Sequence, residues 1–103
     1  MQENISWDSV EEEQLNPSIK RKMIWGEKVM IARLELKDKC LVPQHQHENE
    51  QITQVVSGQM RFEFGGDEPR ELLLNPGDVV VIPADLPHAA TCIGPVDEIE
   101  MWS

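Results

Sequence analysis

All three histidines of the chain fall in two short segments, residues 43–51 and 83–88. His45 and His47 are two residues apart, so on an extended strand their side chains point to the same face. Two imidazoles on one face, joined by a third from elsewhere, form a three-nitrogen site for a divalent metal ion. On the same parity, Gln51 offers an amide oxygen. The spacing therefore predicts a metal site formed by His45, His47, Gln51 and one further histidine.

His88 is the candidate for the third imidazole. It follows a Pro-Gly turn, the β-branched run Val79–Ile82 and a rigid stop at Pro83. Such a turn and such a run are strong local signals for a strand. A His-x-His pair on a surface loop often binds nothing, so the metal hypothesis depends on this third histidine. A histidine just past a strand is well placed to meet one from a neighbouring strand.

The choice of Gln51 as the fourth ligand has chemical consequences. Its amide is neutral, so three imidazoles and one amide would leave the full 2+ charge on the ion, which strengthens Lewis acidity and weakens affinity. Glu50 is a competing ligand, but its parity is opposite to that of His45 and His47, so it needs a bulge to turn inward. We favour Gln51. Nickel, zinc, manganese and iron all accept this ligand set, so we expect one such divalent ion per chain.

Composition limits the class of protein. The 103 residues are enough for one core, and no apolar run approaches the roughly 20 residues that span a bilayer. A net charge of −10 argues against nucleic acid and anionic membrane surfaces as partners. The N-terminus has no features of a secretory signal, and the two cysteines do not indicate a disulfide framework. We therefore expect a cytoplasmic protein with free, buried thiols and a small-molecule substrate.

Apolar and polar residues alternate along most of the chain, and Gly and Pro signals separate the runs. Many short strands with such turns are typical of a β-sandwich or β-barrel. Residues 1–16 are expected to form an N-terminal arm, with a turn of helix over Ser9–Gln14, before a barrel of residues 17–103. The expected strands, with a tight link at Ser57-Gly58, are Ile19–Trp25, Lys28–Leu36, Cys40–His47, Gln51–Val56, Gln59–Phe64, Arg70–Leu74, Val79–Ile82, His88–Ile93 and Glu98–Trp102.

Two motifs give the chain a resemblance to the cupins, a superfamily of small β-barrel enzymes and binding proteins. The residues that match the two motifs in spacing are His45, His47, Gln51, Gly58, Gly77, Pro83 and His88. The chain departs from them at Lys39 and Asp85, where the motifs have Gly, at Gln51 in place of Glu, and at Cys92 in place of Asn. The resemblance implies an all-β, single-domain cupin barrel, or jelly roll. It says much less about the reaction, because fold does not fix function.

A closer resemblance is to small cupins of the pectin-degradation type, the KdgF-like family. It rests on Arg21-Lys22, Glu50-Gln51-Ile52, Ile82-Pro83 and Pro87-His88. The resemblance implies that His45, His47, Gln51 and His88 are the metal ligands. It also implies ring opening of 4,5-unsaturated monouronates to linear keto-sugars. Glu100 and Trp102 stand where that family usually has Asp and Phe.

Glu100, Arg33 and Arg61 are the candidates for catalysis. A carboxylate beside a cation can act as a base, although Glu100 is also consistent with an exposed carboxylate on a strand. Arg33 and Arg61 can grip a substrate carboxylate through a bidentate contact, and surface salt bridging is their alternative role. The sequence does not decide which strand face either arginine occupies.

Three functions remain open at this point. The leading hypothesis is a homodimeric, metal-dependent isomerase or ring-opening enzyme that acts on a small sugar acid. The second is an iron-type dioxygenase that uses the open metal positions for oxygen. The third is a non-catalytic binding module for a sugar or small acid. Metal identity and oxygen demand distinguish them.

Overall fold

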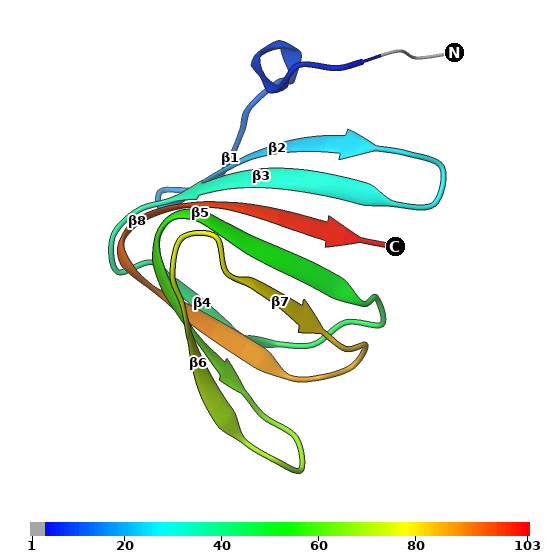
Figure 1. The fold of residues 1–103 in the computed structure, drawn as a ribbon. Coiled ribbons are helices and arrows are strands. Elements are labelled where there is room, and N and C mark those ends of the chain that lie inside the picture. Colours follow the sequence, from blue (N-terminus) through cyan, green and yellow to red (C-terminus); the bar gives the residue numbers. More distant parts are fainter. Residues whose placement is uncertain (1–3) are drawn as a thin grey trace.

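The chain folds into a β-barrel with one turn of helix before it (Figure 1). The structure is a computed structural model and describes residues 4–103. It confirms the predicted all-β jelly roll. The elements are a 3-10 helix at Trp7–Ser9, β1 (Glu13–Asn16), β2 (Ile19–Trp25), β3 (Met30–Leu36), β4 (Leu41–His45), β5 (Gln51–Phe64), β6 (Arg70–Leu74), β7 (Val79–Ile82) and β8 (His88–Trp102).

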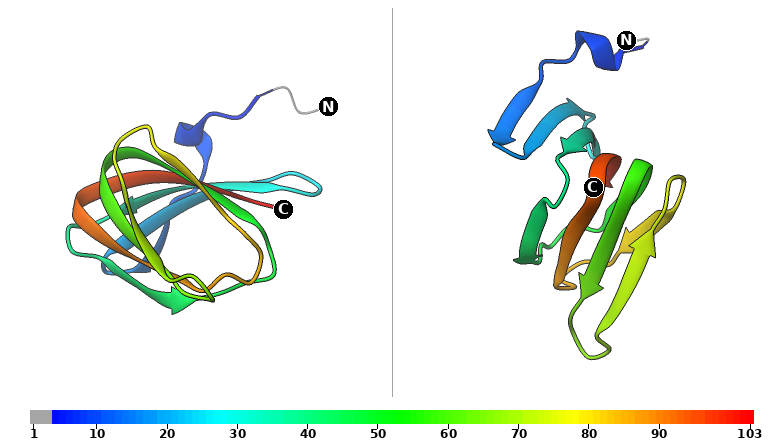
Figure 2. Two further views of the ribbon diagram at one scale, coloured as in Figure 1. Left: turned by 60° about the horizontal axis from the view of Figure 1, so that its bottom comes forward. Right: turned by 90° about the vertical axis from the view of Figure 1, so that its left-hand side faces the viewer.

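Two long strands, β5 and β8, run through the whole barrel (Figure 2). The first half of β5 pairs with β7 and with the end of β8, which also pairs with β3. The second half of β5 pairs with β6 and with the beginning of β8, which also pairs with β4. Each long strand therefore belongs to both walls of the barrel. The breaks predicted at residues 57–58 and 94–97 were wrong.

The bend in β5 explains why a turn signal lies inside a strand. The register between β5 and β8 shifts on both sides of Ser57, which is the mark of a bulge that bends a strand. Gly58 has a φ of 82°, and a Cβ there would lie 2.1 Å from the carbonyl oxygen of Pro95. Only glycine fits this position, so the Ser57-Gly58 signal marks a barrel corner and not a hairpin.

Alternation along the strands places the core inside the barrel. Met60, Phe62 and Phe64 are buried, whereas Arg61 and Glu63 between them are exposed. The core continues across the neighbouring strands with Ala32, Leu34, Leu36, Val55, Leu74, Val80, Ile82, Ala90, Cys92 and Val96. Cys40 and Cys92 are both buried and free, as predicted.

The N-terminal segment differs from the expected arm. The predicted helix over Ser9–Gln14 was wrong: Ser6 caps a 3-10 turn at Trp7–Ser9 instead. The chain then forms β1, which pairs with β2. The first three residues of the arm lie outside the described residues. Across residues 4–103, no helix has the length and apolar character needed to cross a membrane.

Candidate functional site

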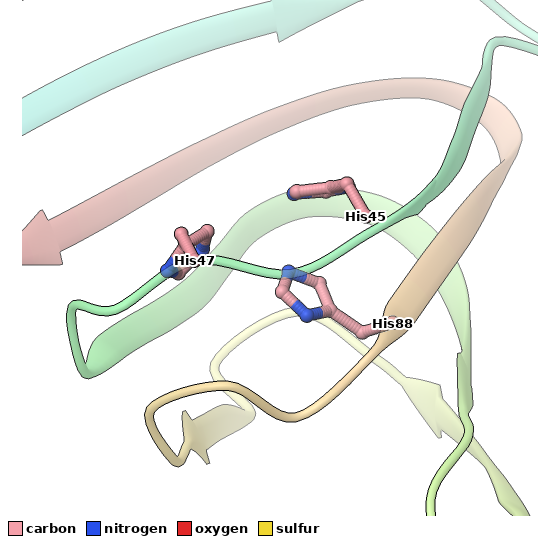
Figure 3. Close-up of side chains that lie close together, drawn as sticks. All are labelled: His45, His47 and His88. Atoms are coloured by element: carbon pink, nitrogen blue, oxygen red, sulfur yellow. The ribbon is translucent and has the colours of Figure 1, made fainter.

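The three histidines meet where β4 ends and β8 begins (Figure 3). His45 and His88 are register partners on these strands, with ring centroids 4.3 Å apart. His47 lies in the loop after β4, 5.3 Å from His88 by the same measure. One ring nitrogen from each of the three histidines lies within 4.8 Å of the other two. The predicted strand over residues 40–47 ends at His45, so a loop and not strand parity brings His47 to the cluster.

Each imidazole is oriented by a backbone carbonyl at its Nδ1. His45 Nδ1 lies 3.0 Å from the oxygen of Pro43, His47 Nδ1 2.8 Å from that of Asn49, and His88 Nδ1 2.8 Å from that of Leu86. A carbonyl only accepts, so each Nδ1 carries the proton. The Nε2 lone pairs are then free to act as ligands. This carbonyl–histidine arrangement is typical of metal sites.

His88 is the most buried of the three histidines. Its ring is buried, and its Nε2 has no hydrogen-bond partner. Burial lowers the pKa of His88, and His45 and His47 lower it further, although the Leu86 carbonyl acts in the opposite direction. A neutral, buried imidazole with an unpartnered lone pair is the state that a metal ligand requires.

Gln51 begins β5 and turns its amide oxygen toward the histidines. The indole Nε1 of Trp102 donates to this oxygen at 3.0 Å, and the amide nitrogen of Gln51 lies 2.8 Å from Thr53 Oγ1. An indole N–H can only donate, so Trp102 determines which end of the amide is the oxygen.

The same oxygen of Gln51 lies 2.9 Å from Nε2 of His47. With Nδ1 of His47 protonated, two lone pairs face each other across this gap. A metal ion bound by both atoms would remove the repulsion. Three imidazole nitrogens and an amide oxygen suit a first-row divalent ion, so the residues of this site fit a metal.

Glu100 lies beside this ligand set on β8. Its Oε2 is 3.4 Å from the amide nitrogen of Gln51, on the side of the amide away from His47. Burial raises the pKa of Glu100 to about 7, and the charge of Arg21 opposes the rise. Glu100 also lines a cavity of about 130 Å³ together with His45 and His88. The predicted acid therefore lies next to the predicted ligands.

The two predicted arginines lie elsewhere. Arg33 alternates with buried Ala32 and Leu34, so it points outward, and it binds Asp97 through two hydrogen bonds of 3.0 and 2.6 Å. Arg61 is exposed on the outer face of β5. The structure brings neither arginine to the histidines. Their role in gripping a carboxylate stays a prediction that these positions do not support.

Arg21 is the arginine that sequence reasoning did not select. It lies on β2 between Ile19 and Met23, which pack against the core, so it shares their inward face. Its Nη2 is 3.3 Å from Glu13 of β1, and its Nε is buried without a partner. The sequence signal that could have placed Arg21 on the inward face is its position two residues from both Ile19 and Met23, which are apolar.

The competing ligand Glu50 is exposed, whereas Gln51 is buried. Asn49 contributes its backbone carbonyl to His47 and its side chain to the carbonyl of Ser103. The loop between β4 and β5 thus presents His47 to the cluster and leaves Glu50 outside, and Gln51 follows as the first residue of β5.

The chain belongs to the cupin family, because a family model of the cupin domain matches residues 33–101, more than half of its length. KdgF from Halomonas sp. is 30% identical, with a TM-score of 0.80, covering 93% of this chain and 89% of KdgF. The chain is therefore a small cupin that resembles KdgF.

More distant structures share the fold. A RmlC-like cupin from Shewanella frigidimarina is 23% identical with a TM-score of 0.87, covering 99% of this chain and 91% of that one. A variant of oxalate decarboxylase from Bacillus subtilis is 15% identical with a TM-score of 0.83, covering 96% of this chain and 28% of that one. Curated protein sequences give no significant match.

Proposed function

We propose that this cupin is a metal-dependent enzyme that opens the ring of a small sugar acid, such as a 4,5-unsaturated monouronate. One observation carries the proposal: the side-chain amide of Gln51 lies between the candidate metal ligands and the carboxyl group of Glu100. Its oxygen lies 2.9 Å from His47 and its nitrogen 3.4 Å from Glu100. The 30% identity to KdgF from Halomonas sp. supports the same class of reaction.

The chemistry needs a proton acceptor close to an electrophile. When bound by His45, His47, His88 and Gln51, a divalent ion would polarise substrate oxygens as a Lewis acid. In ring opening, the anomeric hydroxyl loses its proton, the bond from C1 to the ring oxygen breaks, and a carbonyl forms at C1. The released enol becomes a ketone as a proton adds to C4. No oxidant is required.

Glu100 is the group that moves protons in this proposal. It lines the cavity beside His45 and His88, so it can take the hydroxyl proton and return one to carbon. Arg21 holds the substrate carboxylate in place of Arg33 and Arg61, because it faces inward and its Nε has no partner. A homodimer and a cytoplasmic location remain predictions.

The test is turnover of a 4,5-unsaturated galacturonate by protein loaded in turn with nickel, zinc, manganese and iron. Loss of the ultraviolet absorbance of the conjugated double bond reports the reaction, and an oxygen electrode runs in parallel. We expect metal-dependent loss of absorbance without oxygen uptake. Oxygen uptake would support the dioxygenase hypothesis, and no reaction with any metal would contradict the proposed function.

A further inference from the structure

The cavity beside the histidines extends into the barrel. Its volume is about 130 Å³, which corresponds to roughly four water molecules at about 30 Å³ each. This is less than the roughly 300 Å³ that ligand pockets usually start from, so only one end of a sugar acid can enter. Its lining is mostly apolar, and the polar side chains in it are His45, Gln51, His88, Glu98 and Glu100.

Glu98 is the group in this cavity that the proposed mechanism does not use. It is 4% exposed, and its Oε2 is fully buried without a hydrogen-bond partner. Its register partners on β3 and β5 are Leu34 and Val55, which offer apolar side chains. A buried carboxyl that the fold does not satisfy is destabilising, so such groups in natural proteins need a specific reason.

The charges around the cavity limit what Glu98 can bind. Among the described residues that line it there is no Lys or Arg, and two of them, Glu98 and Glu100, carry carboxyl groups. A carboxylate or phosphate that entered beyond the metal ligands His45, Gln51 and His88 would meet acidic groups and no cationic side chain. Burial, together with the charges of Glu100 and Asp97, raises the pKa of Glu98 well above its ordinary value. A neutral acid both donates and accepts, which suits a hydroxyl or a carbonyl.

We propose that Glu98 anchors the uncharged, hydroxyl-bearing end of the substrate inside this cavity. The carboxylate of the sugar acid then stays outside the cavity, where Arg21 is the inward-facing cation. The identity of the substrate rests on the proposed function, whereas the existence of an anchor rests on the unsatisfied oxygen of Glu98 alone. Glu98 therefore selects ligands with a neutral polar end over ligands that are charged at both ends.

The first arm of the test needs no ligand. The melting temperatures of metal-loaded wild type, Glu98→Leu and Glu98→Gln are compared by calorimetry, with Glu63→Leu on the exposed face of β5 as the matched control. We expect Glu98→Leu to raise Tm by roughly 4–8 °C, because a buried, unpaired carboxyl is removed. A fall in Tm for Glu98→Leu would show that the fold itself uses this carboxyl, no change would show that the buried carboxyl is not destabilising, and either result would overturn the proposal.

The second arm measures steady-state kinetics with 4,5-unsaturated galacturonate. Glu98→Leu should raise KM by roughly tenfold or more, and Glu98→Gln, which keeps a donor and an acceptor, should restore most of the loss. An unchanged KM in Glu98→Leu would overturn the anchor. If wild type does not react with the uronate, the proposed function fails, and the Tm arm still decides whether the fold itself uses Glu98.

Discussion

The indole of Trp102 donates to the amide oxygen of Gln51, and that oxygen faces Nε2 of His47. Trp102 and Gln51 are cross-strand neighbours on β8 and β5. An amide has two nearly isosteric ends, and only one of them can bind a metal. Trp102 therefore keeps the useful end of Gln51 toward the histidines.

Because Trp102 orients the amide of Gln51, the effect of Trp102 on metal affinity should depend on which residue occupies position 51. A double-mutant cycle can measure this dependence. Trp102→Phe should weaken metal affinity by roughly 10–100-fold in the native background, the usual cost of losing a hydrogen bond behind a ligand. In a Gln51→Glu background both ends of the side chain are oxygens, so the same change should have little effect. The measurement is Kd for Ni²⁺ or Co²⁺ by competition titration.

Trp25→Phe is the matched control for the cycle, because Trp25 is 65% exposed. An equal loss of affinity in the native and the Gln51→Glu backgrounds would mean that Trp102 acts through packing alone. No loss in either background would remove any role of Trp102 in positioning the ligand.

Replacing Glu100 by Gln should separate catalysis from metal binding. The variant keeps the size of the side chain but cannot accept a proton, so kcat on the unsaturated uronate should fall by roughly 10²–10⁴-fold while metal content is unchanged. The exposed Glu63→Gln is the control. Wild-type turnover in Glu100→Gln would assign proton transfer to another group.

The buried Glu98 should make stability depend on pH. Its folded pKa is raised, so its contribution is fully present below its unfolded pKa and is lost as pH rises through the folded value. Relative to Glu98→Gln, wild-type protein without metal should lose about 1.4 kcal/mol for each unit of pKa difference. The measurement is the free energy of unfolding in urea between roughly pH 4 and pH 8, a range that begins near the pKa of model carboxyl groups.

Other ionisable groups around Glu98 also have shifted pKa values. Glu100 shares the sign of its effect, His88 has the opposite sign, and Cys40 and Cys92 sense its charge. The difference between the two proteins is therefore the quantity to compare, not the wild-type slope. A difference that does not vary with pH would show that Glu98 titrates normally in the fold.

An apolar row on the outer face of the barrel predicts the homodimer interface. Ile24, Ile31, Met101, Ile52 and Val81 are successive register partners on β2, β3, β8, β5 and β7. Val81 is 52% exposed and Met101 37%, so a second copy of the chain would bury a continuous apolar surface.

Val81→Lys should therefore convert the predicted dimer to a monomer. Its Tm should fall by no more than the loss of the dimer contacts alone would cause. Light scattering after size-exclusion chromatography gives the mass. Leu73→Lys on β6, where the native side chain is 50% exposed, is the control away from the row. A wild-type monomer at micromolar concentration, or a Val81→Lys dimer, would contradict this interface.

The sequence predicted the strands and the clustering of the three histidines better than the connections between the strands. The alternation of Met60, Phe62 and Phe64 depends on local chemistry, so it was visible in one dimension. The continuity of β5 across Gly58 was not visible in the sequence. Close contact with the distant Pro95 carbonyl requires glycine at this position, and in the sequence such a glycine looks the same as one in a turn. Local signals alone cannot separate a corner from a hairpin.

In the candidate site, too, some features could be predicted from local sequence and others depend on distant parts of the chain. His45, His47 and His88 could be found from spacing, whereas the contact from Trp102 to Gln51 depends on the register between strands that are distant in the sequence. The inward orientation of Arg21 depends on which face of β2 packs on the core. Both properties belong to the barrel and not to any short segment.

The most direct test of the metal centre is elemental analysis of tag-free protein by inductively coupled plasma mass spectrometry, with His45→Ala alongside. His45 is exposed, so its removal should leave the fold intact, which circular dichroism checks. We expect about one divalent transition-metal ion per chain in wild type, and a large loss in the variant. Wild type that stays metal-free after incubation with nickel, zinc, manganese and iron would contradict it.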